Sequence, residues 1–409
     1  MRPHCGLEVC MSLTSLLALP ALGLAFLEIT AATRGDAKLR LATEEISDKT
    51  IDFPTSQHAR LRFNIPFSNI GVQQALIIDC IARLQPSGLR YSDLQPTVRL
   101  NNPVSPRKDG YWEATIVKQG KKMVIGVELW LSVNNSRQAV EKLDKLTIEI
   151  LYKYYCRTPM KYCRTEITID PKEFEEIPYK PDPKLSVEPV PKDLGGNTKV
   201  EPIRTHIFMP GEDIIANVKR YTEGKAKPGD IIALAESPVA IMQKRLAYCE
   251  DIKPRYLARR LNWFFAMDSS LSSVYSLEMA FREIGTPRML LSFAAGLLGK
   301  LRHKPGEFYR VAGRSVATID DCTGTLPPFD KHVIMGPANG QQLCEEIYKA
   351  TGIDCTIVDA NDLGKVDVLA LSDPTRKAEV EEALKINPAG NASEMTPIVI
   401  IHKQGAEQA

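Results

Sequence analysis

The side chains best suited to chemistry lie in the second half of the chain, where acidic residues end apolar runs. In residues 318–325 a β-like run stops at Asp320 and Asp321, and a glycine turn follows. Carboxylates held at a strand end suit a hard cation such as magnesium, which takes one or two protein carboxylates together with phosphate oxygens. Because successive side chains of a strand point to opposite faces, we expect one of the two acids to face the site. A solvated strand end with turn-forming aspartates is the alternative.

A second segment places Asp268 and two serines, one of them Ser270, directly after the aromatic run 263–265, which we interpret as a buried strand. One carboxylate and two hydroxyls in this position can bind a metal and a phosphate together, but they also fit the N-terminal cap of a helix over 271–283. Two further polar loops lie beside apolar runs, at 358–364 and 387–394. The sequence leaves open whether these four segments converge on one pocket.

The first half of the chain has the pattern of a β-protein. Short runs between residues 60 and 169 alternate apolar and polar side chains with a period of two, and turn-forming clusters separate them. The predicted strands are 61–67, 75–84, 110–118, 123–133, 146–155 and 162–169, with a short helix over 135–144. Such spacing predicts an antiparallel sandwich, with an immunoglobulin-like arrangement as one form of it. Binding, spacing or docking is the expected role, because this half offers no catalytic constellation.

A proline-rich segment at 171–202 separates the two halves and is expected to be an extended spacer. Beyond it, helical and β-rich runs are mixed, which predicts a domain of the α+β class. The helices are expected at 211–220, 288–302, 341–351 and 375–385, and the strands at 230–235, 315–319, 355–358 and 398–401. The predicted organisation is multi-domain: an N-terminal apolar helix (1–45), an all-β sandwich (55–170), the linker (171–202) and an α+β domain (203–405).

An apolar run over 13–29 precedes the sandwich and is interrupted by Pro20 and Glu28, among other residues. Its length is near the lower limit for crossing a bilayer. Three interpretations fit: a signal-anchor helix, a cleaved secretory signal and a packed first helix. Basic residues at 34, 38 and 40 follow the run, which predicts a membrane anchor with the rest of the chain in the cytoplasm. A soluble cytoplasmic protein is the alternative.

The composition narrows the class of partner. Charged residues make up 25% of the 409 residues and the formal net charge is +2, so nucleic acid is not an expected partner. The nine cysteines contain no C-x-x-C pair, which argues against structural zinc and favours mostly free thiols. A disulfide between Cys156 and Cys163 is the alternative.

Read in chain order, the motifs of the second half resemble the coenzyme F-420:L-glutamate ligase family over residues 202–403. Residues 210–215 resemble its opening segment, and 227–235 its Gly-Asp-apolar strand. Residues 267–270 look like its Asp-x-Ser-Asn metal motif, and 319–324 are similar to the Asp-Thr-Phe-Gly motif that supplies a second metal-binding acid. The order and spacing of these motifs carry the resemblance.

Two later segments complete the resemblance: 358–364 is similar to an Asp-x-x-Gly segment, and 390–399 to the closing Gly-Gln-Ala-Asp strand entry. The family's reaction would then be expected. GTP would phosphorylate the carboxylate of an F-420-0-like precursor, and the amino group of L-glutamate would displace the phosphate to form an amide. Two divalent ions, magnesium or manganese, would neutralise charge on the phosphates. The resemblance also implies a homodimer.

By position, the resemblance implies that Asp268 and Asp321 bind metal and serve catalysis, with Asp320 as a further metal ligand. The side chains expected to contact the nucleotide are Lys244, Arg245, Ser270, Thr323 and Asn391.

The chain departs from the family where Ala240 and Ile241 align with a Ser-Lys pair and Leu271 aligns with an asparagine. Two other functions therefore stay open. One is a membrane-tethered protein of the same fold that holds a ligand without turning it over. The other is an adhesion or docking module that acts through the β-sandwich.

Overall fold

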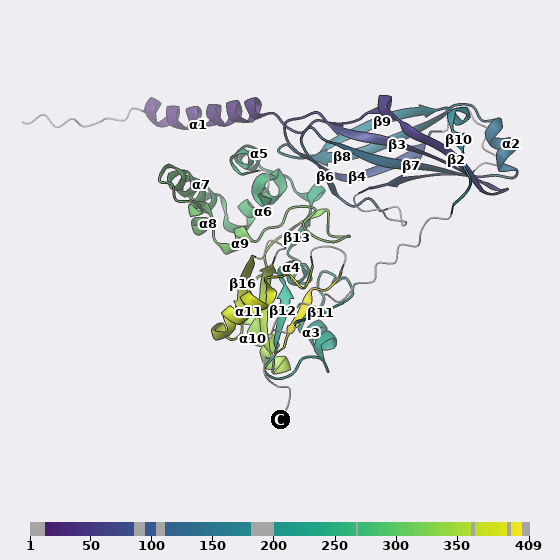
Figure 1. Ribbon diagram of the computed structural model, residues 1–409. Helices are drawn as coiled ribbons and strands as arrows, with labels where there is room; N and C mark the ends of the chain where they lie inside the picture. The colour runs from purple at the N-terminus through teal and green to yellow at the C-terminus, as the bar shows by residue number, and fades with distance from the viewer. Residues whose placement is uncertain are drawn as a thin grey trace, which may run out of the picture. The chain divides into compact units, whose positions relative to one another are not determined.

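The computed structural model describes residues 13–85, 95–103, 111–180, 200–266, 269–360, 365–390 and 394–402. The chain forms two compact units (Figure 1). The first unit comprises Met1–Tyr179 and Pro254–Leu277, and the second comprises Lys180–Lys253 and Glu278–Ala409. Within the predicted linker, Pro171–Glu173 forms a 3-10 turn in the first unit and Val200–Ile203 forms a strand in the second.

Two β-sheets make up most of the first unit. One has the strand order β10-β2-β3-β7-β5, with β1 added against β3, and the other has the order β6-β4-β8-β9. All pairs are antiparallel except β10 with β2. The strands are β1 (Leu39–Leu41), β2 (Ser47–Thr55), β3 (His58–Asn69), β4 (Ala75–Leu84), β5 (Gln95–Asn101), β6 (Thr115–Val117), β7 (Lys122–Ser132), β8 (Leu146–Tyr155), β9 (Lys161–Ile169) and β10 (Glu175–Glu176).

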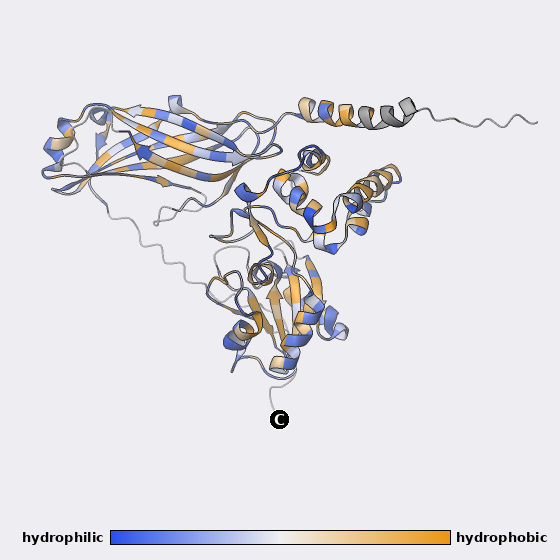
Figure 2. Cartoon of the chain, turned by 180° about the vertical axis from the view of Figure 1, so that it is seen from behind, coloured by the Kyte–Doolittle hydropathy of each residue, from blue (hydrophilic) through white to orange (hydrophobic). Residues whose placement is uncertain are grey.

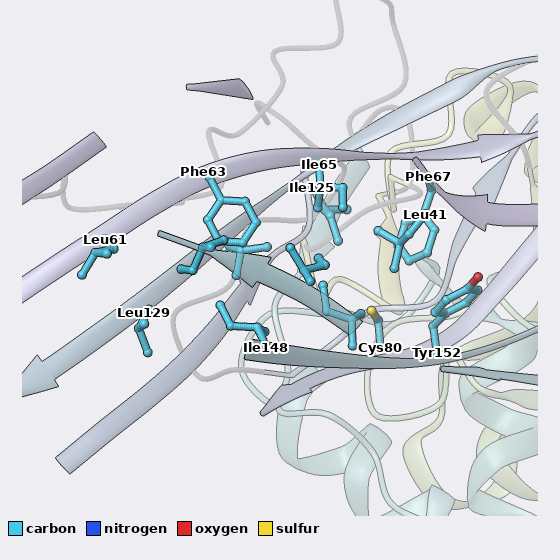
Figure 3. Close-up of a cluster of buried hydrophobic side chains, with 14 of the residues drawn as sticks. Leu41, Leu61, Phe63, Ile65, Phe67, Cys80, Ile125, Leu129, Ile148 and Tyr152 are labelled. Carbon is cyan, nitrogen blue, oxygen red and sulfur yellow. The ribbon is translucent and has the colours of Figure 1, made fainter. Parts of the chain in front are cut away.

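The core of this unit lies between the two sheets (Figure 3). Strand β7 alternates buried and less buried side chains along its length, as a strand with one face in a core must. Its Ile125 and Leu129 pack with Phe63 and Phe67 of β3 and with Ile148 of β8. The predicted sandwich is therefore confirmed. Strands β2 and β5 were not predicted. Within the predicted strand 110–118, residues 111–114 are not part of a strand.

A helical segment completes the first unit. Helix α1 (Leu13–Arg34) packs against α5 (Tyr256–Leu261), and the 3-10 turn η4 (Asn262–Phe264) follows α5. Residues 263–265 were predicted to be a buried strand; they form η4 and its C-terminal cap instead. The C-terminal cap has an extended backbone, but it belongs to none of the sheets that the described residues form.

The expected membrane anchor is wrong for the described part of the chain, where no helix is both long enough and apolar enough to span a bilayer. A span needs about 20 largely apolar residues. Helix α1 has 22 residues, but the polar side chains of Glu28, Thr30, Thr33 and Arg34 crowd its C-terminal part. Glu28 also accepts hydrogen bonds from the Arg260 guanidinium and the Tyr256 hydroxyl, at 2.8 and 2.7 Å. The side chain of Glu28 thus connects helix α1 to helix α5.

The second unit is built on a mixed sheet with the strand order β11-β17-β12-β15-β16. Strands β12 and β15 are parallel, and their neighbours run antiparallel to them. The strands are β11 (Val200–Ile203), β12 (Ile231–Ala235), β15 (Asp354–Ala360), β16 (Val366–Leu371) and β17 (Ile398–Ile401). Most of β12 and all of β17 are buried, and they are coloured hydrophobic in Figure 2.

Helices cover both faces of this sheet. Helices α3 (Ile214–Thr222) and α10 (Gly340–Thr351) pack on the face that carries Ile232 and Ile400. Helix α11 (Lys377–Leu384) packs on the opposite face. The remaining elements are α4 (Glu236–Met242), α6 (Val274–Ile284), α7 (Thr286–Leu301), α8 (Glu307–Ala312), α9 (Arg314–Ala317) and the two-stranded sheet of β13 (Leu246–Tyr248) with β14 (His332–Ile334). The α+β prediction is confirmed.

One local prediction for the second unit is wrong. Residues 315–319 were expected to be a strand, but Arg314–Ala317 forms one helical turn, α9, after Gly313, whose φ of 97° is one that glycine adopts readily. The cysteines were expected to be mostly free, and five of the described cysteines are free thiols, while Cys249 and Cys322 form a disulfide. Cys156 and Cys163, the alternative pair, are both free thiols.

A buried ion pair within the first unit gives a stability prediction. Asp52, which is 0% exposed, accepts hydrogen bonds from Arg60, which is 1% exposed. Asp52→Ala leaves the buried guanidinium without its carboxylate, so we expect a loss of about 3–5 kcal/mol in the free energy of unfolding. Urea denaturation followed by tryptophan fluorescence measures it, because all three tryptophans belong to the first unit.

The matched control is Glu173→Gln, which removes an ion pair to Lys49 whose glutamate is 57% exposed. Exposed pairs contribute less than about 1 kcal/mol, so this variant should unfold almost like the wild type. Equal unfolding midpoints for Asp52→Ala and Glu173→Gln would contradict a stabilising role for the buried pair.

Candidate functional site

Several chain segments meet at one edge of the sheet in the second unit. Because β12 and β15 are parallel and Ala235 pairs with Val358, the residues that follow them emerge at the same edge. Strand β17 enters the sheet there, with Ile398 opposite Leu234. The amide of Ala235 donates to the carbonyl of Pro397 at 2.9 Å. Polar residues at these strand ends are therefore neighbours.

Glu236 occupies this edge, immediately after β12 and at the start of α4. It is only 7% exposed, and its Oε2 atom has no hydrogen-bond partner among the described residues. Burial, followed by the negative charges of Asp320, Asp359 and Asp367, raises the pKa of Glu236 to about 9. A buried carboxyl group surrounded by other acids is a costly arrangement unless a cation or a proton accompanies it.

Asp320 faces the same place from a different segment. Its Oδ2 accepts a hydrogen bond from the Ser237 hydroxyl at 2.9 Å, which ties it to the residue next to Glu236. Its backbone exchanges two hydrogen bonds with Ile334 of β14, at 2.8 and 3.0 Å. Burial raises the pKa of Asp320 to about 6, the Ser237 hydrogen bond opposes that rise, and the charge of Asp359 adds to it.

A close backbone approach makes the Asp320 bridge possible. A Cβ atom at Gly336 would lie 1.9 Å from the Thr318 hydroxyl, so only glycine lets the two segments come together here. This contact fixes the segment that carries Asp320 against β14.

Asp359 is the third acid of this group, near the end of β15. It lies directly opposite Asp367 of β16 in the strand register. Partial burial and the charge of Asp367 raise the pKa of Asp359, while Lys365 lowers it. Arg314 of α9 forms an ion pair with Asp367 and donates to the carbonyl of Val368 at 2.8 Å. Glu236, Asp320 and Asp359 will be called the acid cluster.

Asp321, the other acid of the predicted metal motif, forms hydrogen bonds within its own loop. Its Oδ1 accepts from the amide of Cys322 at 2.9 Å, and its carbonyl accepts from Gly324 at 3.1 Å. Thr323 has a φ of 77°, and its amide donates to the carbonyl of Asp330 at 2.8 Å. The alternation expected from sequence thus has a structural counterpart: Asp320 reaches the acid cluster, while Asp321 shapes the loop.

Lys244 and Arg245, the two basic residues predicted to contact the nucleotide, differ in their contacts. Arg245 forms an ion pair with Glu283 at 2.9 Å and donates to the carbonyl of Gly336 at 2.6 Å. Lys244 is exposed, and its side chain lies over Gly211. The guanidinium of Arg245 is therefore committed to internal contacts, whereas the ammonium group of Lys244 is accessible.

The remaining predicted residues fall elsewhere. Ser270 belongs to the first unit, where its carbonyl accepts a hydrogen bond from the Ser276 hydroxyl. Asp268 and Asn391 lie outside the described residues. Ala240 and Ile241, which align with the family's Ser-Lys pair, are buried in an apolar cluster with Phe329 and Ile334.

A cavity of about 480 Å³ lies in the same unit. Its lining includes Tyr248 and Phe329, whose rings lie at 5.3 and 5.8 Å from that of His332. The buried Nδ1 atom of His332 has no hydrogen-bond partner among the described residues, and burial lowers the pKa of His332. His332 is two residues from Ile334, which bridges to Asp320, so the cavity and the acid cluster share strand β14.

The described residues contain no ready-made group of three or more His, Cys, Asp and Glu side chains at metal-binding distances. The acid cluster nevertheless suits a divalent cation by its chemistry. It offers carboxylate oxygens, which magnesium and manganese prefer, and the orphaned Oε2 of Glu236 has an unused lone pair.

Sequence reasoning missed Glu236 and Ser237. The available signal was their position: they directly follow the apolar run 231–235, just as the predicted acids follow theirs. The resemblance instead aligned the family's Ser-Lys pair with Ala240 and Ile241, further along the chain.

Residues 89–171 match the family described as F420-0:gamma-glutamyl ligase, N-terminal Ig-like domain. Residues 202–359 match F420-0:Gamma-glutamyl ligase. The class of protein is thus a ligase with an Ig-like domain in front of it, and the chain belongs to the F420-0:gamma-glutamyl ligase family. The predicted resemblance, the Ig-like form of the sandwich and the multi-domain organisation are confirmed. A ligase of this family acts on small molecules.

The similarity between this chain and three solved structures is low. The GAE domain of GGA2p from Saccharomyces cerevisiae aligns at 12% identity and a TM-score of 0.19, over 33% of this chain and 89% of its own. The yeast GGA1 GAE domain aligns at 14% identity and a TM-score of 0.18, over 32% of this chain and 98% of its own. A protein from Archaeoglobus fulgidus aligns at 15% identity and a TM-score of 0.15, over 32% of this chain and 98% of its own. Such low scores carry no argument about fold or function. No curated protein matches the chain.

Proposed function

We propose that this ligase joins L-glutamate to the carboxylate of an F-420-0-like acceptor, with GTP as co-substrate and magnesium or manganese as the metal. The observation that carries the proposal is the acid cluster at the edge of the sheet, where Glu236 is buried beside Asp320 and Asp359 with an unused carboxyl oxygen. Acids so placed are suited to a cation, and a cation is what phosphate groups need beside them.

In this proposal Asp320 and Glu236 would hold the metal, with Asp359 nearby. When bound, the metal would neutralise charge on the phosphates. Asp320 is preferred to Asp321 because its carboxylate accepts a hydrogen bond from Ser237, the residue after Glu236, and its charge acts on Glu236. Asp321 and the undescribed Asp268 remain the ligands that the resemblance implies. Their test is substitution in the full chain.

The nucleotide would be held in the second unit by Lys244 and Thr323, with Arg245 as a supporting residue. The resemblance also implies Ser270, which lies in the first unit, and Asn391, which lies outside the described residues. Lys244 is the best-supported of these, because its ammonium group is exposed and its backbone has a φ of 61° that turns the chain at the end of α4. An exposed ammonium at a turn can reach a phosphate without breaking an internal ion pair.

The reaction would proceed in two displacements. The acceptor carboxylate attacks the terminal phosphorus of GTP, GDP leaves, and an acyl phosphate forms. The amino nitrogen of L-glutamate then attacks the acyl carbon, phosphate leaves, and the nitrogen loses a proton as the amide forms. The cavity beside β14 is the proposed place for the acceptor, since aromatic side chains line it and it lies along the strand that bridges to Asp320.

Isothermal titration of the full chain with GTP and ATP, with and without manganese, tests the nucleotide and the metal together. We expect GTP to bind in the presence of manganese and to bind at least about tenfold more weakly without it, because carboxylates and phosphates repel one another. Lys244→Ala should weaken GTP binding, whereas Lys349→Ala, at an exposed position on α10, should leave it unchanged. GTP binding of equal strength with and without manganese would count against the proposed metal site.

A further inference from the structure

The cavity beside β14 carries two charged side chains that the proposed metal and nucleotide sites do not use. They are Arg282 of α6 and Asp251, the last residue of the 3-10 turn η3 (Cys249–Asp251). The other described residues of its lining are apolar or aromatic, and every one of them belongs to the second unit. At about 480 Å³ the cavity has a size at which proteins bind small molecules, roughly 300–1,000 Å³.

A neighbouring acid orients the guanidinium of Arg282. Its Nε atom donates to Oε1 of Glu278, one turn earlier on α6, at 3.0 Å, and Glu278 is only 3% exposed. No described residue accepts a hydrogen bond from the two terminal nitrogens of Arg282. An arginine held through Nε keeps both terminal nitrogens for another acceptor, and a carboxylate has the geometry that matches such a fork.

Asp251 supplies the opposite charge. It is exposed, and its carboxylate accepts no hydrogen bond from the part of the chain that the structure describes. Its charge acts on His332, another lining residue: burial lowers the pKa of His332, and the charges of Asp330 and Asp251 oppose that lowering. A carboxylate in this position can accept hydrogen bonds from an amino group, whether or not that group is protonated.

A guanidinium and a carboxylate in one cavity match the two charged groups of an α-amino acid. The carboxylate of the ligand pairs with Arg282 and its amino group pairs with Asp251, so an amino acid satisfies both side chains, whereas a dicarboxylate or an amine satisfies only one. Amide formation also requires the two substrates of a ligase to meet. The amino acid therefore belongs beside the acceptor that we place in this cavity.

We propose that Arg282 and Asp251 are the residues that select L-glutamate: Arg282 binds one of its carboxylates through the two terminal nitrogens, and Asp251 accepts hydrogen bonds from its amino group. This inference rests on the proposed function and adds to it the residues that recognise the amino acid. It assigns two tasks within the second unit, with the metal at the acid cluster and the amino acid at Arg282 and Asp251.

Two variants of the full chain test the two contacts separately. Arg282→Lys keeps a positive charge beside the buried Glu278 but loses the fork, and Asp251→Asn keeps the size of the side chain but loses its charge. In the ligase assay with F-420-0, L-glutamate, GTP and manganese, each variant should raise KM for L-glutamate about 10-fold or more, with KM for GTP unchanged.

Glutarate, which is L-glutamate without its amino group, separates recognition from a general defect. As a competitive inhibitor against L-glutamate, it should bind Asp251→Asn at least as well as the wild type, and bind Arg282→Lys about 10-fold more weakly. A purely structural defect in Asp251→Asn would weaken glutarate together with L-glutamate. Arg310→Lys is the matched control, because Arg310 pairs with Glu307 of its own helix and is not part of the cavity lining.

An active wild type with an unchanged KM for L-glutamate in either folded variant would overturn the inference and leave the proposed function in place. If Arg282→Lys fails to fold, the exposed Asp251 still provides the test through Asp251→Asn and glutarate. An inactive wild type would overturn the proposed function. Isothermal titration of the full chain with L-glutamate then decides the inference: we expect binding that Asp251→Asn weakens about 10-fold, and no binding to the wild type would contradict it.

Discussion

Replacing Asp320 with asparagine is expected to lower the kcat of the full-length ligase by at least about 10²-fold, because one negative charge disappears where the proposed metal and phosphates meet. The substitution keeps the size of the side chain and leaves its backbone bridge to Ile334 intact. Asparagine can still accept a hydrogen bond from Ser237. The loss should therefore appear in turnover and in the manganese concentration needed for half-maximal rate, with little change in thermal stability.

Asp321→Asn is the closest control that the chain offers. It removes the same charge one residue away, at a carboxylate whose Oδ1 accepts from the amide of Cys322 within its own loop. We expect a smaller loss than for Asp320→Asn. A larger loss for Asp321→Asn would reverse the assignment and favour the ligand implied by the family resemblance.

Glu236→Gln is expected to change stability and activity in opposite directions. The folded-state pKa of Glu236, about 9, lies above its ordinary value of 4.5, so the folded protein binds a proton that the unfolded chain has released. The contribution of this group to stability is therefore full below about pH 4.5 and is lost as the pH rises toward 9, by at most about 1.4 kcal/mol for each pH unit. Glutamine keeps its hydrogens at every pH, so the metal-free variant should be more stable than the wild type at pH 8.

The same variant should lose metal-stimulated turnover by about 10²-fold, since an amide is a much poorer ligand for a hard cation than a carboxylate. Thermal unfolding from pH 5 to 9, with and without manganese, measures both effects: manganese should stabilise the wild type and not the variant. The control is Glu345→Gln, at an exposed position on α10. A parallel pH dependence for wild type and Glu236→Gln would show that Glu236 is not the buried, protonated acid described above.

The sequence was a good guide to the fold because periodicity reports burial. Strand β7, which alternates buried and less buried side chains along its length, was predicted to within one residue of its bounds. Short elements were harder. Residues 315–319 look apolar enough for a strand, but Gly313 starts a helical turn there, and only the tertiary bridge from Asp320 to Ile334 gives the following residue its β-pairing.

The candidate site was predictable only in part, since it depends on which strands are parallel. Asp320 was named from its motif, but Glu236 joins it through the parallel pairing of β12 with β15 and the hydrogen bond of Ser237. Neither is visible in the spacing of residues along the chain.

The most direct measurement is the ligase reaction itself. The full chain is incubated with F-420-0, L-glutamate, GTP and manganese, and the products are analysed by mass spectrometry beside a reaction with the Asp320→Asn variant. We expect the acceptor to gain the mass of one glutamyl residue or more, with release of GDP and phosphate in the wild type and far less in the variant. No glutamylated product from the folded wild-type protein, with either GTP or ATP, would contradict the central claim that this chain is a working γ-glutamyl ligase.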